Sequence, residues 1–262
     1  MRERLAYVQF RGSIREQSVE PFLGLLKSLR QRRRVRGVLL DISSGGGGSI
    51  ASTDFYLAVK RLDQVKPVFA SIGSIGASGA YMAALGARRI YAYPDSEVGS
   101  IGVLFPHIAV RDLLAKLGIQ VELLHEGRHK DAYQGLRPLS DEERAKLQAV
   151  AADGYQSFVE LVAHERRRPV DEIRALATGE FWSGKQALRL GLIDALGDRE
   201  DALRALGELT GISPERTVRW QPPRPFLQRV LSGGSSALGA SLAAGVRDGL
   251  EDALFEAALR RR

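Results

Sequence analysis

Three serines occur in residues 71–84, SIGSIGASGAYMAA, between an apolar run and a helix-like stretch. Ser78 stands in a G-x-S-x-A pattern, directly between a predicted strand and a predicted helix. Small neighbours let the backbone turn sharply there and present the hydroxyl, as a nucleophile elbow requires. The same residues also permit close helix–strand packing. We therefore predict Ser78 as the candidate nucleophile, with Ser71 inside the strand and Ser74 at the turn in a capping role.

A serine nucleophile needs a base, and the segment 123–133, LLHEGRHKDAY, offers two kinds. His125 and His129 flank a predicted strand end, and Lys130 follows a glycine turn. A lysine can take the serine proton only if its amine is shielded from water and neutral. Arg128 cannot serve, because guanidinium does not deprotonate in proteins. The local choice lies between His129 and Lys130.

Residues 41–50, DISSGGGGSI, form a second glycine-rich site after a predicted buried strand. Successive glycines leave backbone N–H groups free to point at an anion. A phosphate cradle is one interpretation, but no Lys-Ser/Thr pair follows, so the segment is not a P-loop. An oxyanion hole is another, with one N–H here and one beside Ser78. A flexible loop is the third.

Composition excludes several other chemistries. The chain of 262 residues has no cysteine and four histidines without metal-ligand spacing, so we expect no metal site and no cofactor. Its formal net charge is +7, and much of the excess is arginine in RQRRRVRG, ERRRP and residues 260–262. We expect these clusters to be solvated helix ends, with weak association to a membrane surface as the alternative. No aromatic residues interleave with them, so no specific nucleic-acid partner is expected.

The amino-terminal sequence has neither a signal-peptide core nor a stretch of about 18 apolar residues. The chain as given is therefore expected in the cytoplasm, with association to a membrane as the alternative.

Strand and helix patterns alternate along the first 200 residues. We predict strands at 4–12, 35–42, 67–73, 89–94 and 119–126, and helices at 18–31, 51–65, 78–87, 108–117, 141–168, 170–177 and 184–190. Ser18 is the predicted cap of the first helix, and Ser140 with Glu143 resembles a capping box. A last short strand is expected within 191–198. Such alternation predicts an α/β fold of repeated βαβ units with a mostly parallel sheet and a C-terminal helical region.

The composition changes after Trp220, where QPPRPF is typical of a linker and a small-residue stretch follows. We predict one domain over 1–220 and, over 221–262, a linker with an amphipathic helical tail. A disordered tail is the alternative.

Several segments together resemble the signal peptide peptidase A (SppA) family of serine proteases, peptidase family S49, of the Clp-protease/crotonase superfamily. They are LDISSGGGGSIAS, SIGASGAYMAA, GSIGV at 99–103, EGRHKDA, RPLSDEERAKLQ and FWSGKQALRLGLIDALG, in that order. The resemblance covers residues 4 to about 210. It implies a Ser-Lys dyad with Ser78 as nucleophile and Lys130 as general base.

The resemblance also implies an oxyanion hole in which Gly79 acts with Gly46 or Gly47. The chain departs from the family pattern at Gly45, which replaces a proline, at His129, which replaces a tyrosine, and at Ala80, which replaces a glycine. The first change loosens the loop, and the other two remove no catalytic atom. The family carries a membrane anchor, and we expect none within residues 1–262 because no stretch there is long and apolar enough.

The family implies peptide substrates, such as signal-peptide remnants or other short hydrophobic peptides. A ring or dome of identical subunits is also expected, with Lys130 near an interface that shields it from water. Two alternatives are a CoA-thioester enzyme of the crotonase type and a non-catalytic relative of the same fold.

Overall fold

The computed structural model describes residues 3–222, and the part up to Gln221 forms one compact unit. Residues 223–262, which hold most of the predicted linker and the helical tail, lie outside the described residues. The predicted division into two domains therefore stays a prediction.

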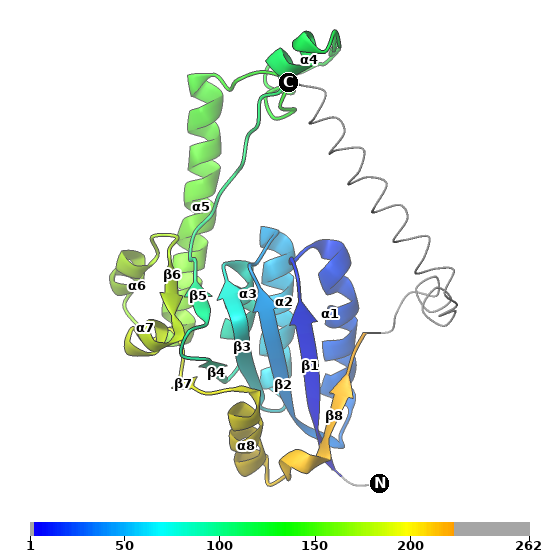
Figure 1. Cartoon of the computed structure of the whole chain (residues 1–262), viewed down its shortest axis with the longest axis vertical. Helices are drawn as coiled ribbons and strands as arrows, with labels where there is room; N and C mark the ends of the chain where they lie inside the picture. Colours follow the sequence, from blue (N-terminus) through cyan, green and yellow to red (C-terminus); the bar gives the residue numbers. More distant parts are fainter. Residues whose placement is uncertain (1–2, 223–262) are drawn as a thin grey trace, which may run out of the picture. The chain divides into compact units, whose positions relative to one another are not determined.

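A mostly parallel sheet organises this unit, in the order β6-β5-β3-β2-β1-β8, with β4 paired to β3 and β7 (Figure 1). Within residues 3–222, β5 and β6 are the only strands that pair in the antiparallel sense. The strands are β1 Arg4–Arg11, β2 Val35–Ser44, β3 Val68–Ala77, β4 Arg89–Ala92, β5 Glu97–Gly99, β6 Phe181–Ser183, β7 Ala195–Leu196 and β8 Thr217–Trp220. This confirms the α/β fold with a mostly parallel sheet. The carboxyl ends of β2 and β3 meet at one edge of the sheet, where the glycine loop and the Ser78 turn follow.

Helices cover both faces of the sheet. One face carries α1 Glu16–Gln31, α2 Ser49–Asp63, α3 Gly79–Leu85 and the second half of α5 Asp141–Arg166, which share the larger core. The other face carries α8 Arg199–Thr210 over Leu5, Leu39 and Phe69. The shorter elements are α4 Arg111–Lys116, α6 Val170–Leu176, α7 Gly184–Arg189 and the 3-10 turn Pro214–Arg216. β2 is buried along nearly its whole length because helices pack on both of its sides.

Successive side chains of β1 alternate between the two faces of the sheet and so contribute to both cores. Ala6, Val8 and Phe10 point into the larger core, whereas Leu5 and Tyr7 point to the α8 side. Phe10 is almost fully buried and meets Phe22 of α1 and Phe55 of α2 edge-on, with ring centroids 5.1 Å apart in each pair. The centroids of Phe22 and Phe55 are 6.3 Å apart.

Three local predictions are wrong. Residues 119–126 form no strand, because no neighbouring strand pairs with them there. α1 begins at Glu16, two residues before the predicted start, and Ser18 lies at its third position with its hydroxyl accepting the N–H of Arg15. Ser74 lies inside β3, where its hydroxyl bonds that of Ser43 instead of capping a helix. The strands β5, β6 and β8 and the helix α8 were not predicted.

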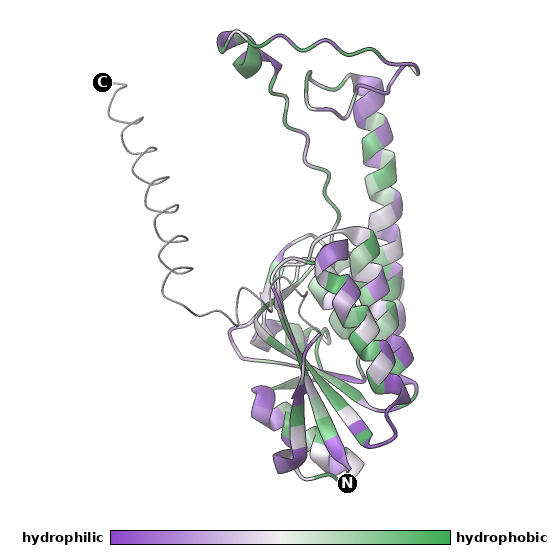
Figure 2. Cartoon of the chain, turned by 90° about the vertical axis from the view of Figure 1, so that its right-hand side faces the viewer, coloured by the Kyte–Doolittle hydropathy of each residue, from purple (hydrophilic) through white to green (hydrophobic). Residues whose placement is uncertain are grey.

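After β5 the chain leaves the sheet as an arm, defined here as residues 104–140, and returns along α5 (Figure 1). The capping box of Ser140 and Glu143 is present at the start of α5 as predicted. The first half of α5 is largely exposed, and its packing on the core begins at the partly buried Tyr155, followed by the buried Phe158. Apolar residues recur along the arm without cover from the rest of the unit (Figure 2). Among residues 3–222, no helix combines the length and the hydropathy needed to cross a lipid bilayer.

Candidate active site

Ser78 occupies a strained turn between β3 and α3. It is the N-cap of α3, with φ 51° and ψ −123°, in a region that residues with a side chain rarely adopt. Its N–H donates to the Gly99 carbonyl at 2.7 Å, and its carbonyl accepts from Met82 at 2.9 Å. The side chain is half-buried, and the hydroxyl makes no hydrogen bond within residues 3–222. Strain of this kind persists where the surroundings hold it, and it presents a hydroxyl at a helix start as the predicted elbow requires.

The glycine loop after β2 lies directly against this turn. A β-carbon on Gly46 would come within 2.7 Å of the Gly79 nitrogen, 2.8 Å of the Ala77 carbonyl oxygen and 2.9 Å of the Ser78 β-carbon. Gly46 also has φ 91°, so a side chain is excluded both by space and by conformation. The loop is held from outside by Ile14, whose N–H donates to the Gly46 carbonyl and whose carbonyl accepts from Gly48. The structure thus brings Ser78, Gly46, Gly47 and Gly79 together.

Hydrogen bonding separates the two candidate donors of the loop. The Gly46 N–H donates to the Ser44 hydroxyl at 3.1 Å. The Gly47 and Gly79 N–H groups make no hydrogen bond to any residue that the structure describes. A β-carbon on Gly79 would lie 3.6 Å from the Gly47 nitrogen, so these two unpaired donors are neighbours. Backbone N–H groups are nearly always paired, and Gly79 is buried, which makes this pair a suitable place for an oxyanion.

Ser52 of α2 packs against Gly79 at the start of α3. Its side chain fills the space that a β-carbon on Gly79 would need, and its hydroxyl donates to the Gly48 carbonyl at 2.8 Å. Ser52 is 1% exposed, so the α2 start, the glycine loop and the α3 start are packed as one piece.

Lys130 lies on the arm and is not among the residues found in contact with the Ser78 turn. It is exposed, in a turn closed by its N–H donating to the Gly127 carbonyl at 3.1 Å, at the end of the arm before α5. Gly154 of α5 lies beside Val103, close to the sheet, and α5 begins at Asp141. At 1.5 Å per residue, these thirteen steps carry the arm roughly 20 Å beyond that point. Figure 1 shows α4 and the start of α5 away from the sheet, and the base that the resemblance implies belongs to this arm, whereas Ser78 directly follows β3.

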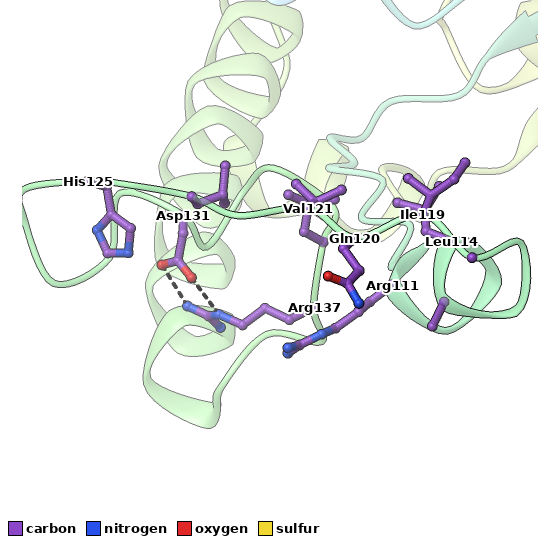
Figure 3. A pocket seen from close by; sticks show the side chains of 12 residues that line it. Arg111, Leu114, Ile119, Gln120, Val121, His125, Asp131 and Arg137 are labelled. Carbon is purple, nitrogen blue, oxygen red and sulfur yellow. Dashed lines mark hydrogen bonds and ion pairs between the residues drawn. The ribbon is translucent and has the colours of Figure 1, made fainter.

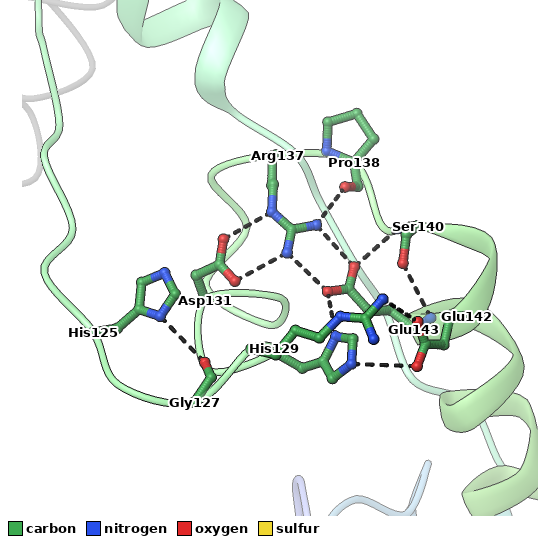
Figure 4. A network of polar contacts seen from close by, with 10 residues as sticks. His125, Gly127, His129, Asp131, Arg137, Pro138, Ser140, Glu142 and Glu143 are labelled. Atoms are coloured by element: carbon green, nitrogen blue, oxygen red, sulfur yellow. Dashed lines mark hydrogen bonds and ion pairs between the residues drawn. The ribbon is translucent and has the colours of Figure 1, made fainter.

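A network of charged side chains fixes the turn that carries Lys130 (Figure 4). Arg137 donates two hydrogen bonds to Asp131, at 2.8 and 2.9 Å, and two to Glu143, at 2.8 Å each. His129 contacts Glu143 at 3.1 Å and Glu142 at 3.4 Å. Asp131 and His129 flank Lys130 in the chain, so both of its neighbours are tied to the start of α5.

Arg137 has the largest effect on the pKa values of the two carboxylates in this network. The guanidinium holds the pKa of Glu143 well below its usual range, aided by the Ser140 N–H, and it lowers the pKa of Asp131 as well. The two carboxylates in turn raise the pKa of Arg137. All three groups stay charged at neutral pH, with the Glu143 side chain 3% exposed. Sequence reasoning recognised Glu143 as part of a capping box but missed Arg137. The sequence signal that could have indicated its role is its position three residues before the capping Ser140, within reach of Glu143.

The arm also encloses a cavity of about 540 Å³ (Figure 3). Its walls come from α4 and the segment that follows it, including Leu114, Ile119 and Val121, with Asp131 and Arg137 on the far side. None of Ser78, Gly46, Gly47 and Gly79 lines this cavity, so it is separate from the nucleophile turn.

Comparison with known proteins agrees with this architecture. The model of peptidase family S49 matches residues 60–213. A candidate protease of Synechocystis sp. is 34% identical over 239 residues, which are 90% of this chain and 86% of that protein. The chloroplastic serine protease SPPA of Arabidopsis thaliana is 32% identical over 84% of this chain, and the match spans 33% of its own length.

Among solved structures, a ClpP1 variant from Listeria monocytogenes superposes with a TM-score of 0.50, over 75% of this chain and 93% of that chain, at 13% identity. This likeness confirms the predicted fold class. The family match covers more than half of the chain, and together with the Synechocystis relative it shows that the protein belongs to peptidase family S49, a family of serine proteases.

Proposed function

We propose that this protein is a serine endopeptidase in which Ser78 is the nucleophile and the N–H groups of Gly47 and Gly79 bind the oxyanion. The observation that carries the proposal is the strained Ser78 turn packed against two neighbouring, unpaired backbone donors. Family membership supports the same chemistry.

Lys130 is the proposed general base. Its neutral amine takes the proton of the Ser78 hydroxyl as the oxygen attacks the scissile carbonyl carbon. The resulting oxyanion is held by the two glycine N–H groups. The protonated lysine gives its proton to the leaving amine, the C–N bond breaks, and an acyl-enzyme ester remains. Water then attacks this ester, Lys130 takes its proton, and the Ser78 oxygen leaves and regains a proton.

The geometry supports a base supplied by a second copy of the chain. Lys130 lies on the arm, roughly 20 Å of helix beyond the point where α5 meets the Val103 segment. The arm is unusually apolar at its surface, with Leu104, Ile108 and Leu124 being 80%, 73% and 91% exposed. Apolar patches of this kind mark interfaces. A neighbouring copy that covers the arm would shield Lys130 from water and bring it to the Ser78 of that copy, as in a ring or dome.

The substrates proposed are short hydrophobic peptides, including remnants of signal peptides. The resemblance to the SppA family supports this class, as does the name of the plant relative.

Complementation between inactive variants tests the proposal. Ser78→Ala and Lys130→Ala should each reduce peptide hydrolysis at least 1,000-fold, and a fluorophosphonate should label the wild type at Ser78 but not the Ser78→Ala variant. Mixing the two variants should restore activity, because one copy provides the serine and the other the lysine. Lys146→Ala, at an exposed lysine on α5, is the control and should keep full activity.

Three results would overturn parts of this proposal. Full activity in Ser78→Ala would remove the nucleophile. Activity that survives Lys130→Ala but not His129→Ala would move the base by one residue. A mixture that stays inactive, although native mass spectrometry with one variant isotopically labelled shows mixed oligomers, would place serine and lysine in the same chain.

A further inference from the structure

A second pocket lies at the edge of the sheet opposite to the Ser78 turn. It has a volume of about 400 Å³ and is lined by Arg4, Arg32, Arg33, Arg34, Val35 and Trp220. α1 ends at Gln31, residues 32–34 turn the chain, and β2 begins at Val35, beside the start of β1. β2 runs from this pocket to the glycine loop, which at about 3.3 Å per residue separates the two by roughly 30 Å.

The arginines of this pocket lack anionic partners. Within residues 3–222, none of the four guanidinium groups forms an ion pair with a carboxylate, whereas the neighbouring Arg36 contacts Glu3 at 3.5 Å. Arg32 donates to the Ser28 hydroxyl at 3.3 Å and stacks 4.6 Å above the Trp220 ring. Four like charges around one hollow repel one another, which favours a bound anion.

Capping of α1 does not account for the cluster. Cationic side chains often gather at a helix C-terminus to meet its free carbonyl groups. Here Lys66 does so, with its amine donating to the carbonyls of Leu29 and Arg32 at 2.8 and 2.9 Å. Lys66 is 8% exposed, and its burial, together with the charge of Arg36, lowers its pKa. The arginines are thus left free to face the pocket.

Trp220 adds an unpaired donor. Its indole nitrogen is buried and has no acceptor among the described residues. A tryptophan N–H only donates, and buried donors are nearly always paired. Because this nitrogen is not accessible to solvent, Trp220 contributes to the pocket through its ring, against which Arg32 stacks.

We propose that this pocket binds phosphate groups, held by two or more of the guanidinium groups of Arg4, Arg32, Arg33 and Arg34 beside Trp220. Guanidinium matches phosphate oxygens in a bidentate manner, and the volume admits a ligand larger than one phosphate. The source is either a soluble diphosphate compound or the headgroups of an anionic phospholipid surface. This function is additional to proteolysis and does not depend on it.

The two tryptophans of the chain make the site measurable. Trp182→Phe in the full-length protein leaves Trp220 as the sole tryptophan, within the pocket. Titration with inorganic diphosphate should then change its fluorescence in a saturable way, with calorimetry as the second measurement. In the same background, Arg32→Gln, Arg33→Gln and Arg34→Gln together should weaken binding at least tenfold. These side chains are exposed, so the fold should not change.

A control with equal loss of charge separates a built site from general attraction. Arg61→Gln, Arg189→Gln and Arg216→Gln remove three scattered, exposed arginines and should change the affinity less than twofold. Sedimentation with phosphatidylglycerol and phosphatidylcholine vesicles distinguishes the two sources. Binding to phosphatidylglycerol vesicles that the pocket variant loses and the control keeps identifies lipid headgroups, whereas selective loss for diphosphate alone identifies a soluble ligand. If neither probe distinguishes the pocket variant from the control, the proposal is wrong.

Discussion

The Ser78 turn and Gly46 are in direct contact: the β-carbon that Gly46 lacks would lie 2.9 Å from the β-carbon of Ser78. This contact joins the end of β2 to the end of β3, two segments more than thirty residues apart in the chain. The loop that carries the proposed oxyanion donor and the turn that carries the proposed nucleophile therefore cannot move independently.

Gly46→Ala should lower kcat/KM at least 100-fold. The new methyl group would push the loop away from the Gly79 nitrogen, and φ 91° would be strained for alanine. Loss of one oxyanion donor costs about 100- to 1,000-fold in rate. Gly45→Ala is the matched control, since its β-carbon would meet only the Ile75 side chain at 3.9 Å. Equal losses in the two variants, measured by steady-state kinetics, would contradict the specific role of Gly46.

Arg137→Ala should reduce kcat about 10- to 100-fold with a smaller effect on KM. Removal of the guanidinium leaves Asp131 and the buried Glu143 without their main partner and loosens the turn that carries Lys130. Arg137→Lys should restore only part of the rate, because an ammonium cannot bond both carboxylates in the same bidentate way. Hydrogen exchange of residues 127–143 should rise in parallel. Arg144→Ala, at an exposed arginine on α5, should behave like the wild type. If it loses as much activity as Arg137→Ala, the contacts of Arg137 with Asp131 and Glu143 are not the cause.

The arm of the wild type should loosen at a lower pH than the arm of the Arg137→Ala variant. Arg137 lowers the native pKa of Glu143, so the folded arm is favoured at pH above the ordinary glutamate value of about 4.3. That stabilisation is lost as pH falls through the lower native pKa. In Arg137→Ala the Glu143 pKa should move upward, and protease sensitivity of the arm should appear at a higher pH. Identical pH profiles in the two proteins would show that Arg137 does not govern this carboxyl.

Phe10→Ala should reduce the free energy of unfolding by about 3–5 kcal/mol, as expected for removing a buried aromatic ring. Phe10 is 1% exposed and packs on Phe22 and Phe55, each with ring centroids 5.1 Å from its own. Ile50→Ala, at a side chain that is 69% exposed, provides the comparison and should stay within about 0.5 kcal/mol of the wild type. Urea denaturation followed by circular dichroism measures both. A loss below about 1 kcal/mol for Phe10→Ala would mean that the core repacks.

Local sequence patterns were sufficient for much of the fold. Apolar runs identified β2 and the first part of β3, and the capping box located the start of α5. They were insufficient where pairing decides the structure. Residues 119–126 have a strand-like composition, but they lie on the arm with no strand to pair with, and backbone groups without a partner strand do not form a sheet. Ser74 is drawn into β3 because that strand continues to Ala77.

The candidate site likewise has features that short sequence segments reveal and features that only the tertiary structure determines. The small residues around Ser78 and the glycine run after β2 are properties of short segments, and the sequence by itself singled them out. For the base, the residues alone left His129 and Lys130 open, and only the family resemblance favoured Lys130. Tertiary structure decided which N–H groups remain unpaired, because the Ser44 hydroxyl takes the Gly46 N–H and leaves those of Gly47 and Gly79. It also decided that Lys130 lies at the far end of α5. Distance in space depends on the path of the arm, which is set by packing of Phe158 and its neighbours on the core and not by the motif around the lysine.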